Sequence, residues 1–157
     1  MNRKQRLALN EVRIRGKDII DSDLFRRCNN VIHHKKTTAA MHMMHVACMS
    51  LLICNFLEHF NIDVDRNMMV TVSLLHDIGM INRHRMSHPV TSHYHESVRI
   101  SNKMFHVSKR EEIAIARHMF PVSPIPPTFR EGIVLTISDK ICSIKEATGY
   151  TFECKLV

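Results

Sequence analysis

Histidine and aspartate residues stand at spacings that could bring several metal ligands together. The chain has 12 histidines in 157 residues, and His42, His76 and His118 fall in three separate segments expected to be helical. Asp77 follows His76 directly, and Asp139 lies in a fourth such segment. Helical metal sites are usually built from side chains on facing helices of a bundle. Neutral imidazoles with carboxylates suit Fe, Mn, Zn or similar divalent ions, rather than Ca or a thiolate-bound structural zinc.

The doublet His76-Asp77 carries the most specific chemical expectation. Adjacent residues of a helix point about 100° apart, so at a helix end His76 could take an ion while Asp77 reaches the same ion from the side. The second oxygen of Asp77 could then bridge to a second ion. Asp77 also follows the stretch Ser73-Leu74-Leu75, where an unpaired buried carboxylate would be costly and a metal would satisfy it.

Three ordered motifs resemble the signatures of the HD-domain phosphohydrolase superfamily, most closely those of its small stand-alone bacterial members. They read HMMHVA from His42, LLHDIG from Leu74 and ISDK from Ile137. The ligand spacings are 34 residues from 42 to 76 and 62 residues from 77 to 139. The resemblance implies an all-α HD-domain helical bundle, with residues 1–157 as one domain and a motif-bearing core at about 33–147.

The resemblance also implies a ligand set. His42, His76, Asp77 and Asp139 match the superfamily's metal ligands. Some subfamilies add two histidines that bind a second metal, and RHMFP around His118 resembles the segment that carries one of them. For the other we take His93, because of its distance to His118. His88 remains the competitor, since family members often show a proline after this histidine and here Pro89 follows His88.

The resemblance implies hydrolysis of a phosphomonoester or phosphodiester, and we expect the substrate to be nucleotide-like. The attacking water would be activated by one or two divalent ions (Fe, Mn, Zn, Mg or Co). Candidate cations for binding the phosphate are Arg83, Arg85 and Lys140. The segment from His33-His34 to Thr37-Thr38 resembles an HH…TT stretch of this group, in which His34 would line the pocket. Three side chains are candidates for orienting the water or protonating the leaving group: Asp77, His34 and Glu96.

The elements that must position these residues are predicted to be helices. Apolar periodicity and capping residues predict helices at about 3–20, 24–32, 39–60, 66–76, 90–105, 108–118 and 129–147. Thr37 or Thr38, Ser108 and Thr128 are expected N-caps. Gly79 is expected to close the helix that carries the doublet. Residues 81–89 read as irregular, and strand signals are weak everywhere.

Composition and charge narrow the functional classes. The net charge of +7 and pI of about 9.4 favour anionic partners, such as a small phosphorylated substrate. Much of the positive charge lies in the first thirty residues, without the interleaved aromatic side chains that stack on bases, which argues against nucleic acid. The odd number of cysteines without a CxxC pair predicts buried free thiols in a reducing compartment.

We expect a cytoplasmic protein without a membrane partner, because no apolar region follows the N-terminal charges. The longest apolar stretch, 46–57, is interrupted by polar residues and too short to span a bilayer. The oligomeric state stays open, a homo-oligomer included.

Two other functions compete with an enzyme. A metal-binding regulatory module of the same fold would keep the ligands without turnover. A basic helical nucleic-acid-binding domain would bind without metal, and its binding would weaken steeply with salt. The remaining histidines are expected to be hydrogen-bonded structural residues, among them His45, His59, His84, His95 and His106.

Overall fold

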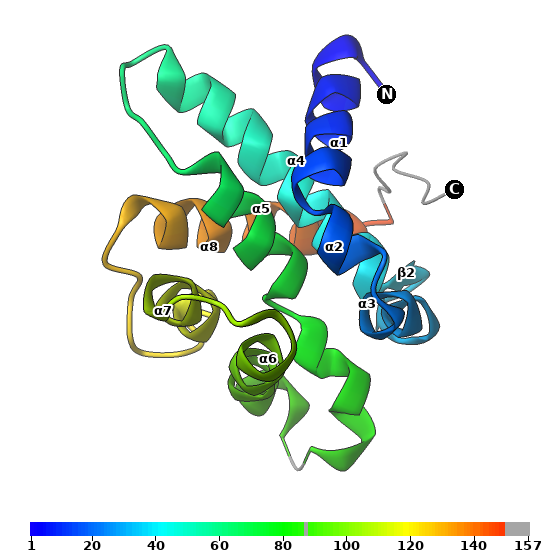
Figure 1. The fold of residues 1–157 in the computed structure, drawn as a ribbon. Coiled ribbons are helices and arrows are strands. Elements are labelled where there is room, and N and C mark those ends of the chain that lie inside the picture. The colour runs from blue at the N-terminus through cyan, green and yellow to red at the C-terminus, as the bar shows by residue number, and fades with distance from the viewer. Residues whose placement is uncertain (87, 150–157) are drawn as a thin grey trace.

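The protein is an all-helical bundle with one small β-ribbon, seen in a computed structural model that describes residues 1–86 and 88–149 (Figure 1). The N-terminal part holds α1 (Arg3–Arg15), α2 (Lys17–Ile20), α3 (Asp23–Arg27) and the 3₁₀ helix η1 (Cys28–Asn30). The bundle itself consists of α4 (Ala39–Glu58), α5 (Arg66–Leu75), η2 (Ile78–Arg85), α6 (Pro89–Phe105), α7 (Lys109–Arg117) and α8 (Arg130–Ala147). The predicted all-α class is therefore confirmed.

Capping residues begin several helices where the sequence predicts. The hydroxyl of Thr38 accepts a hydrogen bond from the Met41 amide at the start of α4. Ser108 and Glu111 form a reciprocal capping box at the start of α7. Such caps satisfy amides that the first turn of a helix leaves without an intrahelical partner.

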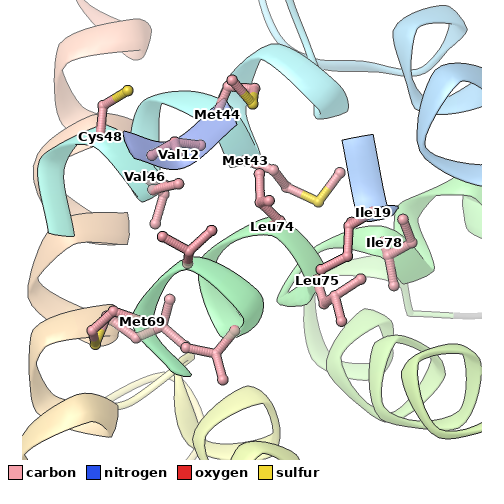
Figure 2. Packing of buried hydrophobic residues seen from close by; sticks show 14 of the residues in the cluster. Val12, Ile19, Met43, Met44, Val46, Cys48, Met69, Leu74, Leu75 and Ile78 are labelled. Atoms are coloured by element: carbon pink, nitrogen blue, oxygen red, sulfur yellow. The ribbon is translucent and has the colours of Figure 1, made fainter. Parts of the chain in front are cut away.

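Helix α4 lies at the centre of the bundle, packed against α1, α5 and α8 (Figure 1). It is apolar and long enough to cross a membrane, with a mean hydropathy of 1.6, but 67% of that stretch is buried inside the protein. The core helix of a soluble domain has these same properties. Figure 2 shows Met43 of α4 near Leu74 of α5, and Val46 and Leu75 belong to the same buried core. The apolar residues that precede His76 thus anchor the end of α5 in the core.

Several local expectations are wrong. The helix expected at 3–20 breaks at Gly16 into α1 and α2, and Gly79 does not close a helix but lies inside η2. The segment predicted to be irregular at 81–89 is mostly η2, a 3₁₀ helix with a kink at Asn82. Thr128 is not a cap, because α8 begins at Arg130 with Phe129 in the N-cap position. The chain at 24–32 is not one helix: it passes through α3 and η1 into the two-stranded antiparallel ribbon β1 (Ile32–His34) and β2 (Thr37–Thr38).

The cysteines follow their prediction within the described residues. Cys28, Cys48, Cys54 and Cys142 are buried free thiols, and burial raises the pKa of Cys54 to about 11. Such thiols resist ionisation and are unreactive. Cys154 lies outside the described residues.

Candidate metal centre

The C-terminal ends of α5 and α7 hold two imidazoles in the interior of the protein in a fixed orientation. His76 and His118 are the C-cap residues of these helices. The Nδ1 atom of each lies within hydrogen-bond distance of a backbone carbonyl three residues earlier, His76 to Ser73 at 2.8 Å and His118 to Ile115 at 2.7 Å. The last carbonyls of a helix have no intrahelical partner, so they are available to accept an N–H. Each Nε2 lone pair is then left for another partner.

Two further helices bring complementary groups to the same place. On α4, His42 is fully buried, and on α8 Asp139 is 4% exposed. Nε2 of His42 lies 3.1 Å from Oδ1 of Asp139. Nε2 of His76 lies 3.8 Å from the same oxygen. The potential ligand atoms of His42, His76 and Asp139 all lie within 4.8 Å of one another.

The carboxylate of Asp77 lies between two sets of imidazoles. Its Oδ2 atom is 2.8, 3.6 and 3.8 Å from Nε2 of His33, His76 and His42. Its Oδ1 atom is 3.2 and 3.6 Å from Nε2 of His93 and His118. A carboxylate with imidazoles on both oxygens has the arrangement that could link two neighbouring ions.

The protonation states of the buried groups differ with their surroundings. Burial lowers the pKa of His76 to about 3, so its imidazole is neutral. Burial also opposes a charge on His42, but the hydrogen bonds to Asp139 and Glu146 raise its pKa to about 10. Burial disfavours the Asp77 carboxylate as well, yet the surrounding imidazoles, His76 first among them, hold the pKa of Asp77 well below its ordinary value.

These residues fit a divalent transition-metal ion. Nε2 of His76 is buried and has no hydrogen-bond partner among the described residues, although it points toward two carboxylates. A buried hydrogen-bond acceptor without a partner is unfavourable unless a proton donor or an ion binds it. Nitrogen ligands mixed with carboxylates are the donor set of Fe, Mn, Zn or Co sites. Because ligands must be deprotonated, metal binding would displace the proton from His42.

A cavity of about 310 Å³ opens onto this cluster. Its walls combine ligand candidates, two cationic side chains and apolar side chains: His33, Asp77, Met80, Arg83, His93, His118, Met119, Val122, Asp139, Lys140 and Ser143. Nζ of Lys140 lies 2.8 Å from Oδ2 of Asp139, and Nη1 of Arg83 lies 3.4 Å from the Ile32 carbonyl oxygen. The cavity therefore offers two cations beside the cluster, where an anionic ligand could bind.

The six residues predicted as metal ligands all lie in the cluster: His42, His76, Asp77, His93, His118 and Asp139. The competitor His88 is exposed at the N-cap of α6 and lines a different cavity. The structure therefore brings His93, and not His88, to Asp77.

Two substrate-binding predictions lie on the cavity and one does not. Arg83 and Lys140 line it, but Arg85 lines a separate cavity, together with Glu96 and His88. In a 3₁₀ helix successive residues turn by about 120°, so Arg83 and Arg85 of η2 point in different directions. The side chain of His34, the other predicted catalytic residue besides Asp77, lies outside the described part of the structure, and its role stays a prediction.

Sequence reasoning missed His33 and Glu146. The ring of His33 stacks on that of His42, with centroids 4.2 Å apart and planes 14° apart, and it contacts Asp77. His33 and His34 are adjacent, and nothing in the sequence indicates which of the two faces the cluster. Glu146 follows Asp139 by seven residues, two helical turns, and that spacing placed it on the same face of α8.

Comparison with known proteins agrees with the geometry of the cluster. A family model described as "HD domain" matches residues 39–144, a range that contains all six of the predicted ligands. No curated protein and no solved structure matches the chain.

Proposed function

The chain belongs to the HD-domain family, and from that premise we propose that it hydrolyses a phosphomonoester or phosphodiester of a nucleotide-like substrate. The family is one of metal-dependent phosphohydrolases. The observation that carries the proposal is the position of Asp77, between five imidazoles at the wall of a cavity that Arg83 and Lys140 also line.

The proposed ligands divide between the two oxygens of Asp77. His42, His76 and Asp139 would hold one ion with Asp77. His93 and His118 would hold a second ion with the same carboxylate. When bound, divalent ions supply Lewis acidity, which lowers the pKa of water and offsets the charge of a phosphoryl group.

The protein's own side chains would bind and orient the substrate. Arg83 and Lys140 carry positive charge to the cavity and would hold phosphate oxygens. His33 lines the same cavity and is 11% exposed, so it could exchange a proton with a substrate oxygen or with water. Met80, Met119 and Val122 supply apolar surface on which an organic group such as a nucleoside would pack.

The test begins with the metal content of protein purified without an affinity metal, measured by elemental analysis. A panel of phosphomonoesters, phosphodiesters and nucleotides then follows, with Mn²⁺ or Fe²⁺ restored. Two ions per chain with turnover would support the binuclear site, and one ion with turnover would leave the site of His42, His76, Asp77 and Asp139. Metal without turnover on any ester would favour the regulatory module over the enzyme.

A matched pair of variants makes the test specific. Asp77→Asn removes the central charge while keeping the side-chain volume, and should lose both metal and turnover while remaining folded. Asp63→Asn changes an exposed carboxylate away from the cluster and should retain both. The circular dichroism spectrum shows whether Asp77→Asn is folded. A folded Asp77→Asn variant with its full metal content would refute the role given to Asp77.

A further inference from the structure

Glu146 is a buried carboxylate that lies behind the cluster rather than in the cavity. It is 2% exposed and stands near the C-terminal end of α8. One oxygen, Oε2, lies 2.9 Å from Nδ1 of His42, and the other, Oε1, lies 2.7 Å from Nδ1 of His45. Since an ionised carboxylate can only accept hydrogen bonds, both imidazoles donate to it through Nδ1–H.

The two histidines reach Glu146 because of their spacing on α4. His42 and His45 are three residues apart, so they lie on one face of the helix, and both are fully buried. Each oxygen of this buried carboxylate is held by a separate imidazole.

His42 needs this side-chain acceptor because of its place in the fold. His76 and His118 stand at helix ends and turn Nδ1 toward a backbone carbonyl. His42 lies in the first turns of α4, where the backbone carbonyls are occupied by intrahelical hydrogen bonds. Glu146 supplies the acceptor instead, and the opposite nitrogen of His42 then faces Asp139 and Asp77.

We propose that Glu146, itself held by His45, is a positioning residue that fixes the tautomer and orientation of His42 as a metal ligand. The inference rests on the metal centre of the proposed function. A carboxylate behind a ligating imidazole also makes the nitrogen that faces the metal more basic, and removal of such an outer partner typically costs 10- to 100-fold in metal affinity.

The test compares two isosteric changes in buried glutamates of α8. Glu146→Gln should raise the dissociation constant for Co²⁺ by about 10- to 100-fold with the number of bound ions unchanged. Glu131→Gln is the matched control. Glu131 lies on the same helix, fifteen residues before Glu146, and is also buried, at 5% exposed, but it binds Arg110 and the Asp65 amide instead of the histidines. It should leave Co²⁺ affinity unchanged. Binding is measured calorimetrically and by the visible absorption spectrum of bound Co²⁺, which should shift only in Glu146→Gln.

Further variants guard against a folding defect. Glu146→Asp keeps the charge on a shorter side chain and should recover part of the affinity lost in Glu146→Gln. His45→Gln leaves Glu146 in place but removes its second donor, and should weaken Co²⁺ binding less than Glu146→Gln does. The melting temperature of each metal-free variant separates lost stability from lost affinity.

Three outcomes would overturn the inference. An affinity within twofold of the wild-type value in Glu146→Gln would leave Glu146 a structural residue only. Loss of one bound ion at saturation would make Glu146 a direct ligand. Absence of Co²⁺ binding by the wild-type protein would remove the metal centre altogether. The expected affinity loss without hydrolysis of any ester would instead support the inference and contradict the proposed enzyme activity.

Discussion

At the scale of single residues, Asp77 is a buried carboxylate surrounded by imidazoles. It is 3% exposed, and its carboxylate is shared among five imidazoles from the ribbon, α4, α6 and the ends of α5 and α7. Nε2 of His76 has no hydrogen-bond partner among the described residues. A bound ion would satisfy this buried nitrogen.

His93 and His88 offer a direct test at this scale. His93→Ala should lower the occupancy of the second ion, because His93 is buried with Nε2 3.2 Å from Oδ1 of Asp77. His88→Ala should leave occupancy unchanged, since His88 is exposed beside another cavity. Elemental analysis of both variants at saturating Mn²⁺ decides between them, and an equal loss from both would contradict the assignment.

The residues that the structure brings together around Asp77 could be predicted from short motifs and their order in the sequence, whereas the side chains that contact them could be found only from the fold. His42, His76, Asp77 and Asp139 stand in recognisable short motifs. Glu146 has no such motif, and its significance comes only from the approach of α8 to α4. His33 likewise depends on the ribbon that turns it toward Asp77, and the role of His34 stays a prediction.

At the scale of elements, Gly79 shows how helix packing reaches the site. A Cβ atom at this position would lie 2.5 Å from the His93 carbonyl oxygen and 2.6 Å from the Ser97 amide. The Gly79 amide donates a hydrogen bond to Ser97 Oγ at 3.0 Å. The glycine was predicted to end a helix, but its role in the structure is to let α6 approach η2 closely, which brings His93 beside Asp77.

Gly79→Ala should therefore separate α6 from η2. We expect a loss of about 1–3 kcal/mol in the free energy of unfolding, the usual cost of overpacking, together with lower occupancy of the second ion. Urea unfolding gives the first quantity and elemental analysis the second. Unchanged occupancy in a destabilised protein would show that the close approach serves packing alone.

An ion pair between α1 and α5 provides a pH-dependent test away from the site. Arg66 donates two hydrogen bonds to Glu11, at 2.6 and 2.8 Å, and lowers the pKa of Glu11 from 4.5 to about 2. A carboxylate with a lowered folded-state pKa stabilises the protein above its unfolded pKa, and that contribution disappears as the pH falls from about 4.5 toward 2. Solvent screening of this partly exposed pair limits its contribution to about 1 kcal/mol.

We therefore expect Glu11→Gln to lower the free energy of unfolding by about 1 kcal/mol at pH 7, with a difference from wild type that shrinks below pH 4.5. Asp21→Asn, at an exposed pair with Lys17, should have no measurable effect at either pH. Urea titrations at several pH values provide the data. A difference that grows toward low pH would have the wrong sign for this ion pair.

The long helices were easier to predict than the segments that connect them. Apolar periodicity located α4, α5 and α8 because each buries a stripe in the core, and caps such as Thr38 and Ser108 are local in sequence. The 3₁₀ helix η2 and the ribbon were missed, because their conformations depend on contacts with α6 and α4 rather than on their own residues. The kink at Asn82, which lies between Arg83 and the doublet, could not be read from polar composition.

For the whole molecule, the candidate ligands come from separate elements, so an ion bound at the cluster would link these elements. An ion that binds only the folded state stabilises it by about 2.7 kcal/mol at a free concentration 100 times its dissociation constant. For a domain of this size that corresponds to a rise of roughly 5–10 °C in the melting temperature. Differential scanning calorimetry with Mn²⁺ and with a chelator should show this rise in wild type and not in Asp77→Asn. Equal melting temperatures in the two conditions would contradict a metal bound at this cluster.

The distribution of the cluster along the chain has a consequence for biosynthesis. His33 and His42 are made early, whereas Asp139 and Glu146 belong to α8, the last described helix. An ion bound at the cluster would therefore gain its full set of ligands only after α8 has been made, because Asp139 lies 97 residues after His42.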